Sequence, residues 1–209
     1  MRLYGWWLLW VTSNVFGDAS IEGSVELPTA KSTAPAVRYH AMPRVAPAPL
    51  TVAVVFLEGE FAKTNTPHIL KMSQKRFQFE HSILPICVGT RVEFPNEDDD
   101  YHNVFSYSKV RRFDLGRYRK DEAPAGMIFD KIGVVRLFCD IHEHMRGAIL
   151  VLATPHFVVT RPDGSFKLSG LPAGQFKLKV WIDEKTSLEK SVNLRDGETL
   201  QVGKLQPVP

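Results

Sequence analysis

The chain has 209 residues, of which 44% are hydrophobic, and this length suits one large domain or two small ones. Its 26 basic and 23 acidic residues leave a formal net charge of +3, and no basic run is interleaved with aromatic residues as in a nucleic-acid-binding face. The composition predicts a soluble globular protein and sets nucleic acid aside as a partner.

The N-terminus has the pattern of a secretory signal peptide. A charged start precedes an apolar block over residues 4–11, and small residues follow at positions 17–19. A membrane anchor would need about 20 apolar residues, and this block is far shorter. We expect residues 1–19 to be a signal peptide, with export to the periplasm and no stable membrane insertion after cleavage.

The rest of the chain predicts strands and turns, without a convincing helical period. Residues 21–27 alternate between apolar and polar side chains, whereas residues 28–49 are rich in proline and read as an irregular connection that includes His40 and Met42. The β-branched run at residues 50–57 suits a strand buried on both faces. Further strand-like pieces occupy residues 68–80 and 83–94. The sequence therefore predicts an all-β fold.

The acidic cluster at residues 97–100 lacks the alternating ligands and the glycine of a calcium loop, so we interpret it as a solvated turn. His102 follows at a loop-to-strand junction. The basic segment at residues 109–125 is interpreted as a solvated loop, with a docking face for an acidic redox partner as the alternative.

Residues 138–147 place a thiol, an imidazole and a thioether close together, at Cys139, His142 and Met145. Thiolate and thioether suit Cu(I), while imidazole suits Cu(II), and His102 supplies a second imidazole. Two imidazoles, a thiolate and a weak axial thioether form a blue-copper electron-transfer site. His144 is an alternative ligand, but it is adjacent to Met145 in sequence, so His142 is preferred.

The second cysteine leaves a disulfide with Cys139 open, because an exported protein meets an oxidising compartment. Strand alternation argues against that disulfide. Leu84 and Ile86 share a face from which Cys87 points away, whereas Cys139 shares the face of Val135 and Leu137.

Residues 67–153 resemble the cupredoxins, closest to the short-loop amicyanin type, and the periplasmic plastocyanin-like proteins often named methylamine utilisation proteins. The resemblance implies one type 1 copper per chain, with His102, Cys139 and His142 in the trigonal plane and Met145 axial. It also implies that Asn103 joins the two ligand loops by hydrogen bonds. The motifs that carry it are Phe94-Pro95-Asn96, His102-Asn103-Val104-Phe105-Ser106, Phe113-Asp114-Leu115, Gly133-Val134-Val135 and Cys139-x-x-His142-x-x-Met145-Arg146-Gly147.

The tail alternates strands with turns at Asp163-Gly164 and Ala173-Gly174, and residues 191–198 read as a later hairpin. It resembles a carboxypeptidase regulatory-like (transthyretin-like) domain, whose opening strands match Gly23-Ser24-Val25 and residues 53–57. We therefore expect a discontinuous domain over residues 20–62 and 155–209, with a cupredoxin Greek-key β-sandwich inserted in it or joined to it.

These observations favour a periplasmic one-electron carrier whose partner is a cytochrome c or a dehydrogenase. The alternatives are a copper-binding or delivery protein, in which His144, Met42 and Cys87 would matter, and a structural β module with a vestigial metal site. An enzyme is not expected, because Met145 takes the axial position and the sequence holds no second copper cluster or nucleophile triad.

Overall fold

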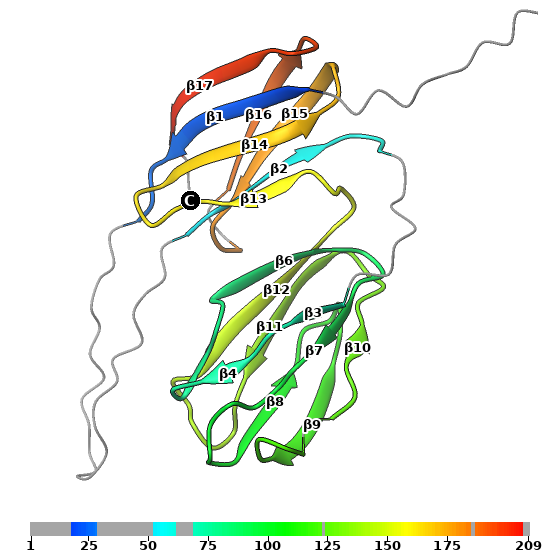
Figure 1. The fold of residues 1–209 in the computed structure, drawn as a ribbon, viewed down its shortest axis with the longest axis vertical. Helices are drawn as coiled ribbons and strands as arrows, with labels where there is room; N and C mark the ends of the chain where they lie inside the picture. Colours follow the sequence, from blue (N-terminus) through cyan, green and yellow to red (C-terminus); the bar gives the residue numbers. More distant parts are fainter. Residues whose placement is uncertain (1–17, 29–51, 62–68, 123, 185–186, 207–209) are drawn as a thin grey trace, which may run out of the picture.

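The structure is a computed structural model that describes residues 18–28, 52–61, 69–122, 124–184 and 187–206. Its regular elements in these residues are all strands, which confirms the all-β class, and they form two sandwiches stacked end to end (Figure 1). No helix in these ranges is long and apolar enough to cross a membrane.

The first sandwich is built from the middle of the chain. One sheet has the order β10-β7-β3 and the other β6-β12-β11-β8-β9, with the hairpin β4-β5 beside them. The strands are β3 (Ile69–Lys71), β4 (Gln74–Lys75), β5 (Gln78–Phe79), β6 (Ile83–Cys87), β7 (Arg91–Glu93), β8 (His102–Ser106), β9 (Phe113–Tyr118), β10 (Met127–Ile128), β11 (Gly133–Phe138) and β12 (Arg146–Leu152).

The second sandwich joins strands from both ends of the chain. Its sheets have the orders β14-β1-β17 and β13-β2-β15-β16. The strand that contains Gly23 pairs with β14 and β17, and the strand that contains Val54 pairs with β13 and β15. The strands are β1 (Ala19–Val25), β2 (Val54–Glu58), β13 (Phe157–Val159), β14 (Ser165–Leu171), β15 (Gly174–Trp181), β16 (Ser187–Leu194) and β17 (Thr199–Leu205).

The two sandwiches share an apolar interface because β2 and β12 bury both of their faces. On β2, Val55 and Leu57 point into the second sandwich, while Val54 faces the interface. On β12, Ile149 and Val151 point into the first sandwich, while Leu150 and Leu152 face Val54. Because side chains alternate along a strand, each of these two strands packs one face into its own sandwich and the other face into the shared interface.

Two local predictions are wrong. Residues 191–198 contain a turn, closed by a hydrogen bond from Glu198 N to Arg195 O, but not a hairpin. β16 pairs with β15 and β17 pairs with β1, so the turn crosses from one sheet to the other. The basic segment is not a loop throughout, because its residues 113–118 form β9 and pair with β8.

Some predicted features lie partly or wholly outside the described residues. These are His40, Met42 and residues 1–17 of the predicted signal peptide. Ala19, the last residue of that predicted peptide, is the first residue of β1, where it is fully buried and pairs with Leu171. The domain boundaries and the carboxypeptidase regulatory-like resemblance stay predictions.

Candidate metal centre

The candidate site lies at one end of the first sandwich, where β8 begins and β11 ends. His102 opens β8 and is fully buried, while Cys139 follows β11 directly and is 4% exposed. The interface with the second sandwich involves β12 from Ala148 to Leu152 and so leaves this end of the strands uncovered.

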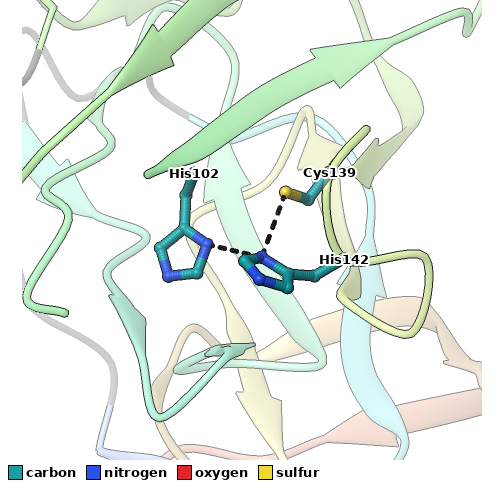
Figure 2. Close-up of side chains that lie close together, drawn as sticks. All are labelled: His102, Cys139 and His142. Atoms are coloured by element: carbon teal, nitrogen blue, oxygen red, sulfur yellow. Dashed lines mark hydrogen bonds between the residues drawn. The ribbon is translucent and has the colours of Figure 1, made fainter. Parts of the chain in front are cut away.

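Three donor atoms converge there. The Nδ1 atoms of His102 and His142 lie 3.0 Å apart, and the Sγ of Cys139 lies 3.9 Å from Nδ1 of His142 (Figure 2). One ligand atom from each of the three residues falls within 4.8 Å of the others. The sequence spacing brought Cys139 and His142 together, and the fold adds His102 from a different strand.

Met145 belongs to the same apolar core as Cys139, is 1% exposed, and donates its backbone N–H to His142 O at 2.9 Å. His144 is used differently, since its Nε2 donates to the carbonyl of Phe77 at 3.0 Å. Its ring centroid lies 6.1 Å from that of His142, so His142, not His144, faces His102 and Cys139.

Asn103 connects β8 to the loop after Cys139. Its Oδ1 accepts the backbone N–H of Asp140 at 2.8 Å, and its Nδ2 donates to Asp114 Oδ1 at 2.9 Å. The buried amide therefore has partners for both of its ends, and it fixes the loop that carries the thiol relative to the strand that carries His102.

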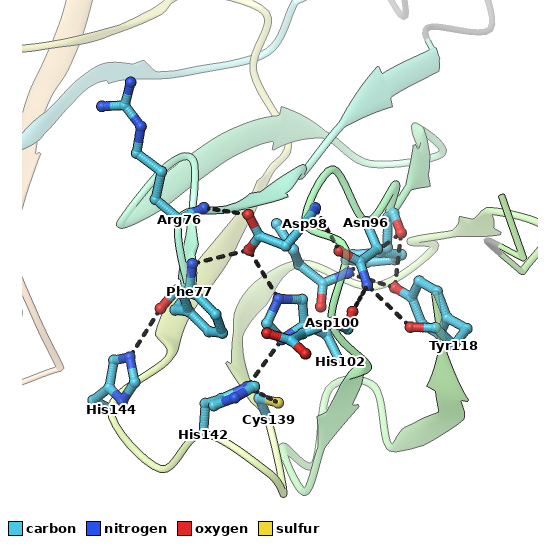
Figure 3. Close-up of polar contacts among 12 residues, drawn as sticks. Arg76, Phe77, Asn96, Asp98, Asp100, His102, Tyr118, Cys139, His142 and His144 are labelled. Atoms are coloured by element: carbon cyan, nitrogen blue, oxygen red, sulfur yellow. Dashed lines mark hydrogen bonds and ion pairs between the residues drawn. The ribbon is translucent and has the colours of Figure 1, made fainter. Parts of the chain in front are cut away.

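Asp98 is a residue that the sequence analysis missed. Its Oδ2 accepts a hydrogen bond from Nε2 of His102 at 2.9 Å, and its side chain is 14% exposed (Figure 3). The interpretation of residues 97–100 as a solvated turn is therefore wrong for Asp98, although Glu97, Asp99 and Asp100 are exposed. The only local signal was its spacing of four residues before His102.

The contact with Asp98 decides which nitrogen of His102 is free. An ionised carboxylate only accepts hydrogen bonds, so Nε2 of His102 carries the proton. In the neutral ring Nδ1 then presents its lone pair toward His142 and Cys139. This is the orientation that a metal-binding histidine needs, with its second nitrogen fixed by a carboxylate.

The surroundings of Cys139 lower the pKa of its thiol and so make the thiolate easier to form. Burial raises the pKa of the Cys139 thiol, but hydrogen bonds from His102, which Nδ1 donates only when that ring is protonated, and from nearby backbone N–H groups outweigh it and lower the pKa. Burial lowers the pKa of His102, yet its bonds to Cys139 and Asp98 raise it overall. Burial lowers the pKa of His142, and the neighbouring His102 and His144 lower it further.

This donor set fits copper. A thiolate, two imidazoles and a nearby thioether are the ligand types of blue-copper sites, whereas magnesium and calcium prefer oxygen. Cys139 is not used in a disulfide, because both it and Cys87 are free. As expected from strand alternation, Cys139 lies in the core of the sandwich, while Cys87 is half-buried and directs its thiol to Thr154 O at 3.6 Å.

No family model and no curated protein matches the chain. Among solved structures, the chain is similar to a mutant of amicyanin in its reduced Cu(I) form at pH 4, with 23% identity, a TM-score of 0.37 and coverage of 47% of this chain and 98% of that one. It is also similar to a copper-containing nitrite reductase from Thermus scotoductus SA-01, with 26% identity, a TM-score of 0.39 and coverage of 46% and 25%. A purple cupredoxin from Nitrosopumilus maritimus has 23% identity, a TM-score of 0.34 and coverage of 37% and 84%. These TM-scores are low, so function has to be argued from the residues of this chain.

Proposed function

We propose that this chain is a type 1 copper protein that carries single electrons in the periplasm. The observation that carries the proposal is the convergence of one ligand atom each from His102, Cys139 and His142 within 4.8 Å of one another. Buried polar groups are costly unless they have partners, and here each of these atoms points at the others.

Each residue has a role that its chemistry explains. Copper, when bound, supplies a one-electron couple between Cu(II) and Cu(I). Cys139 offers a soft anionic donor, and His102 and His142 offer two imidazoles. Met145, from the same core, would offer a weak thioether donor. With all four residues assigned as ligands, no open position remains for substrate, so the chain acts as a carrier and not as an enzyme.

Electron exchange with a partner uses the edge at His142, which is half-buried while His102 is fully enclosed. Two apolar side chains lie next to the ligands in sequence and are open to solvent, namely Ile141 at 39% and Tyr101 at 43% exposure. A cytochrome c or a dehydrogenase would dock there weakly, as transient redox partners do. The second sandwich, attached away from this edge, tethers or positions the carrier.

The test begins with Cu(II) added to the metal-free protein. We expect one copper per chain and the intense visible band of a copper–thiolate bond. Reduction and reoxidation should then be reversible, followed by electron exchange with a periplasmic cytochrome c. Absence of the band would favour a structural module, and loss of copper on reduction would favour copper delivery.

A further inference from the structure

The hairpin β4-β5 has an unusual turn. The register pairs Lys75 with Gln78, which leaves Arg76 and Phe77 as the two turn residues. Their φ angles are 55° and 59°, and they are the non-glycine residues with positive φ among those that the structure describes. Such two-residue turns normally use Asn-Gly, because side chains disfavour left-handed backbone. Strain of this kind persists where surrounding contacts hold it, and it is concentrated at functional sites.

The turn is held by both loops that carry the candidate ligands. Asp98 Oδ1 accepts the N–H of Arg76 at 2.7 Å, and Asp98 Oδ2 accepts the N–H of Phe77 at 2.9 Å. From the other loop, Nε2 of His144 donates to the carbonyl of Phe77 at 3.0 Å (Figure 3). Asp98 therefore binds His102 and the turn with the same carboxylate.

The stem of the hairpin is anchored without this carboxylate. Gln74 N donates to Pro95 O at 2.9 Å, and Glu97 N donates to Gln74 O at 2.8 Å. Lys75 and Glu97 add an exposed ion pair at 2.7 Å. The two hydrogen bonds that Asp98 accepts therefore act on the tip of the hairpin, where they determine the position of Phe77.

The Phe77 ring sits against both candidate imidazoles. Its centroid lies 5.0 Å from that of His142 at an interplanar angle of 77°, and 5.7 Å from that of His102 at 84°. Both contacts are edge-to-face, a favourable arrangement of aromatic rings. The ring is half-buried, so one part of it packs on the imidazoles while another part is open to solvent.

We propose that the Arg76–Phe77 turn is a fixed cover over the candidate metal centre and that Asp98 is the positioning residue that fastens it. The Phe77 ring keeps water and competing ligands from the imidazoles, because the apolar shell around a metal site controls access to it. Asp98 couples the cover to His102, so the imidazole and its shield keep one relative position. We expect the cover to slow the exchange of bound copper, and this part rests on the proposed function. The cover itself exists in the metal-free protein.

The first test measures the tip in the metal-free protein. Amide hydrogen exchange of Arg76 and Phe77 is followed by NMR in Asp98→Asn and in a matched control, Asp99→Asn, which removes the same charge from an exposed neighbour. Losing the charged acceptor should speed exchange of the two amides about tenfold, the equivalent of one charge-assisted hydrogen bond. Asp99→Asn should leave it unchanged. Equal exchange in both variants would overturn the role of Asp98.

The second test measures shielding, also without metal. Diethyl pyrocarbonate modifies accessible imidazoles, and peptide mapping by mass spectrometry reports His142 separately. Phe77→Ala should increase the modification rate of His142 several-fold, and Phe77→Leu should restore most of the protection. If His142 is modified at the same rate in Phe77→Ala as in the chain without a substitution, Phe77 does not shield it.

The third test uses the copper form. Transfer of Cu(II) to excess EDTA should be faster in Phe77→Ala and Asp98→Asn than in Asp99→Asn. If these rates are equal while the first two tests succeed, the cover does not control metal release and that part of the proposal is wrong. If the unmodified chain binds no copper, the proposed function fails, and the first two tests still decide whether the cover exists.

Discussion

The two sandwiches differ in what they bury. The core of the second is lined by aliphatic and phenyl side chains, for example Leu57, Phe166 and Leu178, and its buried polar side chains among the described residues are Ser20 and Thr160. The first sandwich also encloses polar side chains, which are Ser73, Gln74, Thr90, Asn96, His102, Asn103 and Ser106. A domain that only has to fold gains nothing from such residues, because buried polar groups need partners to avoid a penalty. The larger set of buried polar side chains lies in the sandwich that holds the candidate metal centre, and His102 and Asn103 belong to both.

The largest expected effect separates chemistry from folding within the first sandwich. Cys139→Ser should abolish the copper–thiolate band completely, because a hydroxyl is not a soft anionic donor. The free energy of unfolding should change by less than about 1 kcal/mol, since the volumes are similar. The measurements are the visible spectrum after Cu(II) addition and urea unfolding. A retained band would exclude Cys139 as a ligand.

A second pair of variants compares the two cores directly. Leu178→Ala and Leu137→Ala each remove a fully buried leucine and should each cost about 2–5 kcal/mol in urea unfolding. Only Leu137→Ala should alter the copper spectrum, because Leu137 lies on β11 two residues before Cys139. A spectrum altered equally by Leu178→Ala would mean that the second sandwich shapes the metal centre.

A smaller effect concerns pH. Burial lowers the pKa of His156, which packs edge-on against Phe61 at 4.6 Å between ring centroids. Below about pH 6.5 the imidazole takes up a proton in the unfolded chain but not yet in the folded chain. The free energy of unfolding therefore falls as the pH drops from about 6.5 to the lowered pKa of the folded state. His156→Gln should reduce this acid-side loss. An unchanged pH profile would show that the pKa of His156 is the same in the folded and the unfolded chain.

The smallest effect is expected at the other cysteine. Cys87→Ser should leave the copper spectrum unchanged and shift the free energy of unfolding by no more than about 0.5 kcal/mol. The side chain is half-buried, and a hydroxyl can also donate to Thr154 O. A loss of stability or colour comparable to that of Cys139→Ser would give Cys87 a role in the site.

Local alternation predicted much of the fold. Val135, Leu137 and Cys139 share the inward face of one strand, and Phe166 and Leu178 line the second core, because side chains alternate along a strand. Residues 191–198 were predicted as a hairpin, and a turn does form there at residues 195–198. Its residues do not specify which sheet the next strand joins, and that choice depends on β1, far away in sequence.

The contacts around the site were less predictable. Asp98 reads as one carboxylate of an acidic turn, and only the fold brings the N–H groups of Arg76 and Phe77 to it. The Arg-Phe turn carries no Asn-Gly signal, so its left-handed backbone has no trace in the sequence. Sequence spacing suggested the donor set, while the groups that orient and cover it are set by long-range packing.

The position of β1 has a consequence for how the chain is made. β1 pairs in parallel with β17, and the hydroxyls of Ser20 and Thr199, 179 residues apart, lie 2.9 Å from each other. β1 precedes every strand of the first sandwich in the chain, whereas its partners β14 and β17 both follow that sandwich, so β1 stays unpaired until these later strands are present. Until then its unpaired edges and apolar face are open to other chains. Among the described strands, β1 is thus made early and protected from aggregation late.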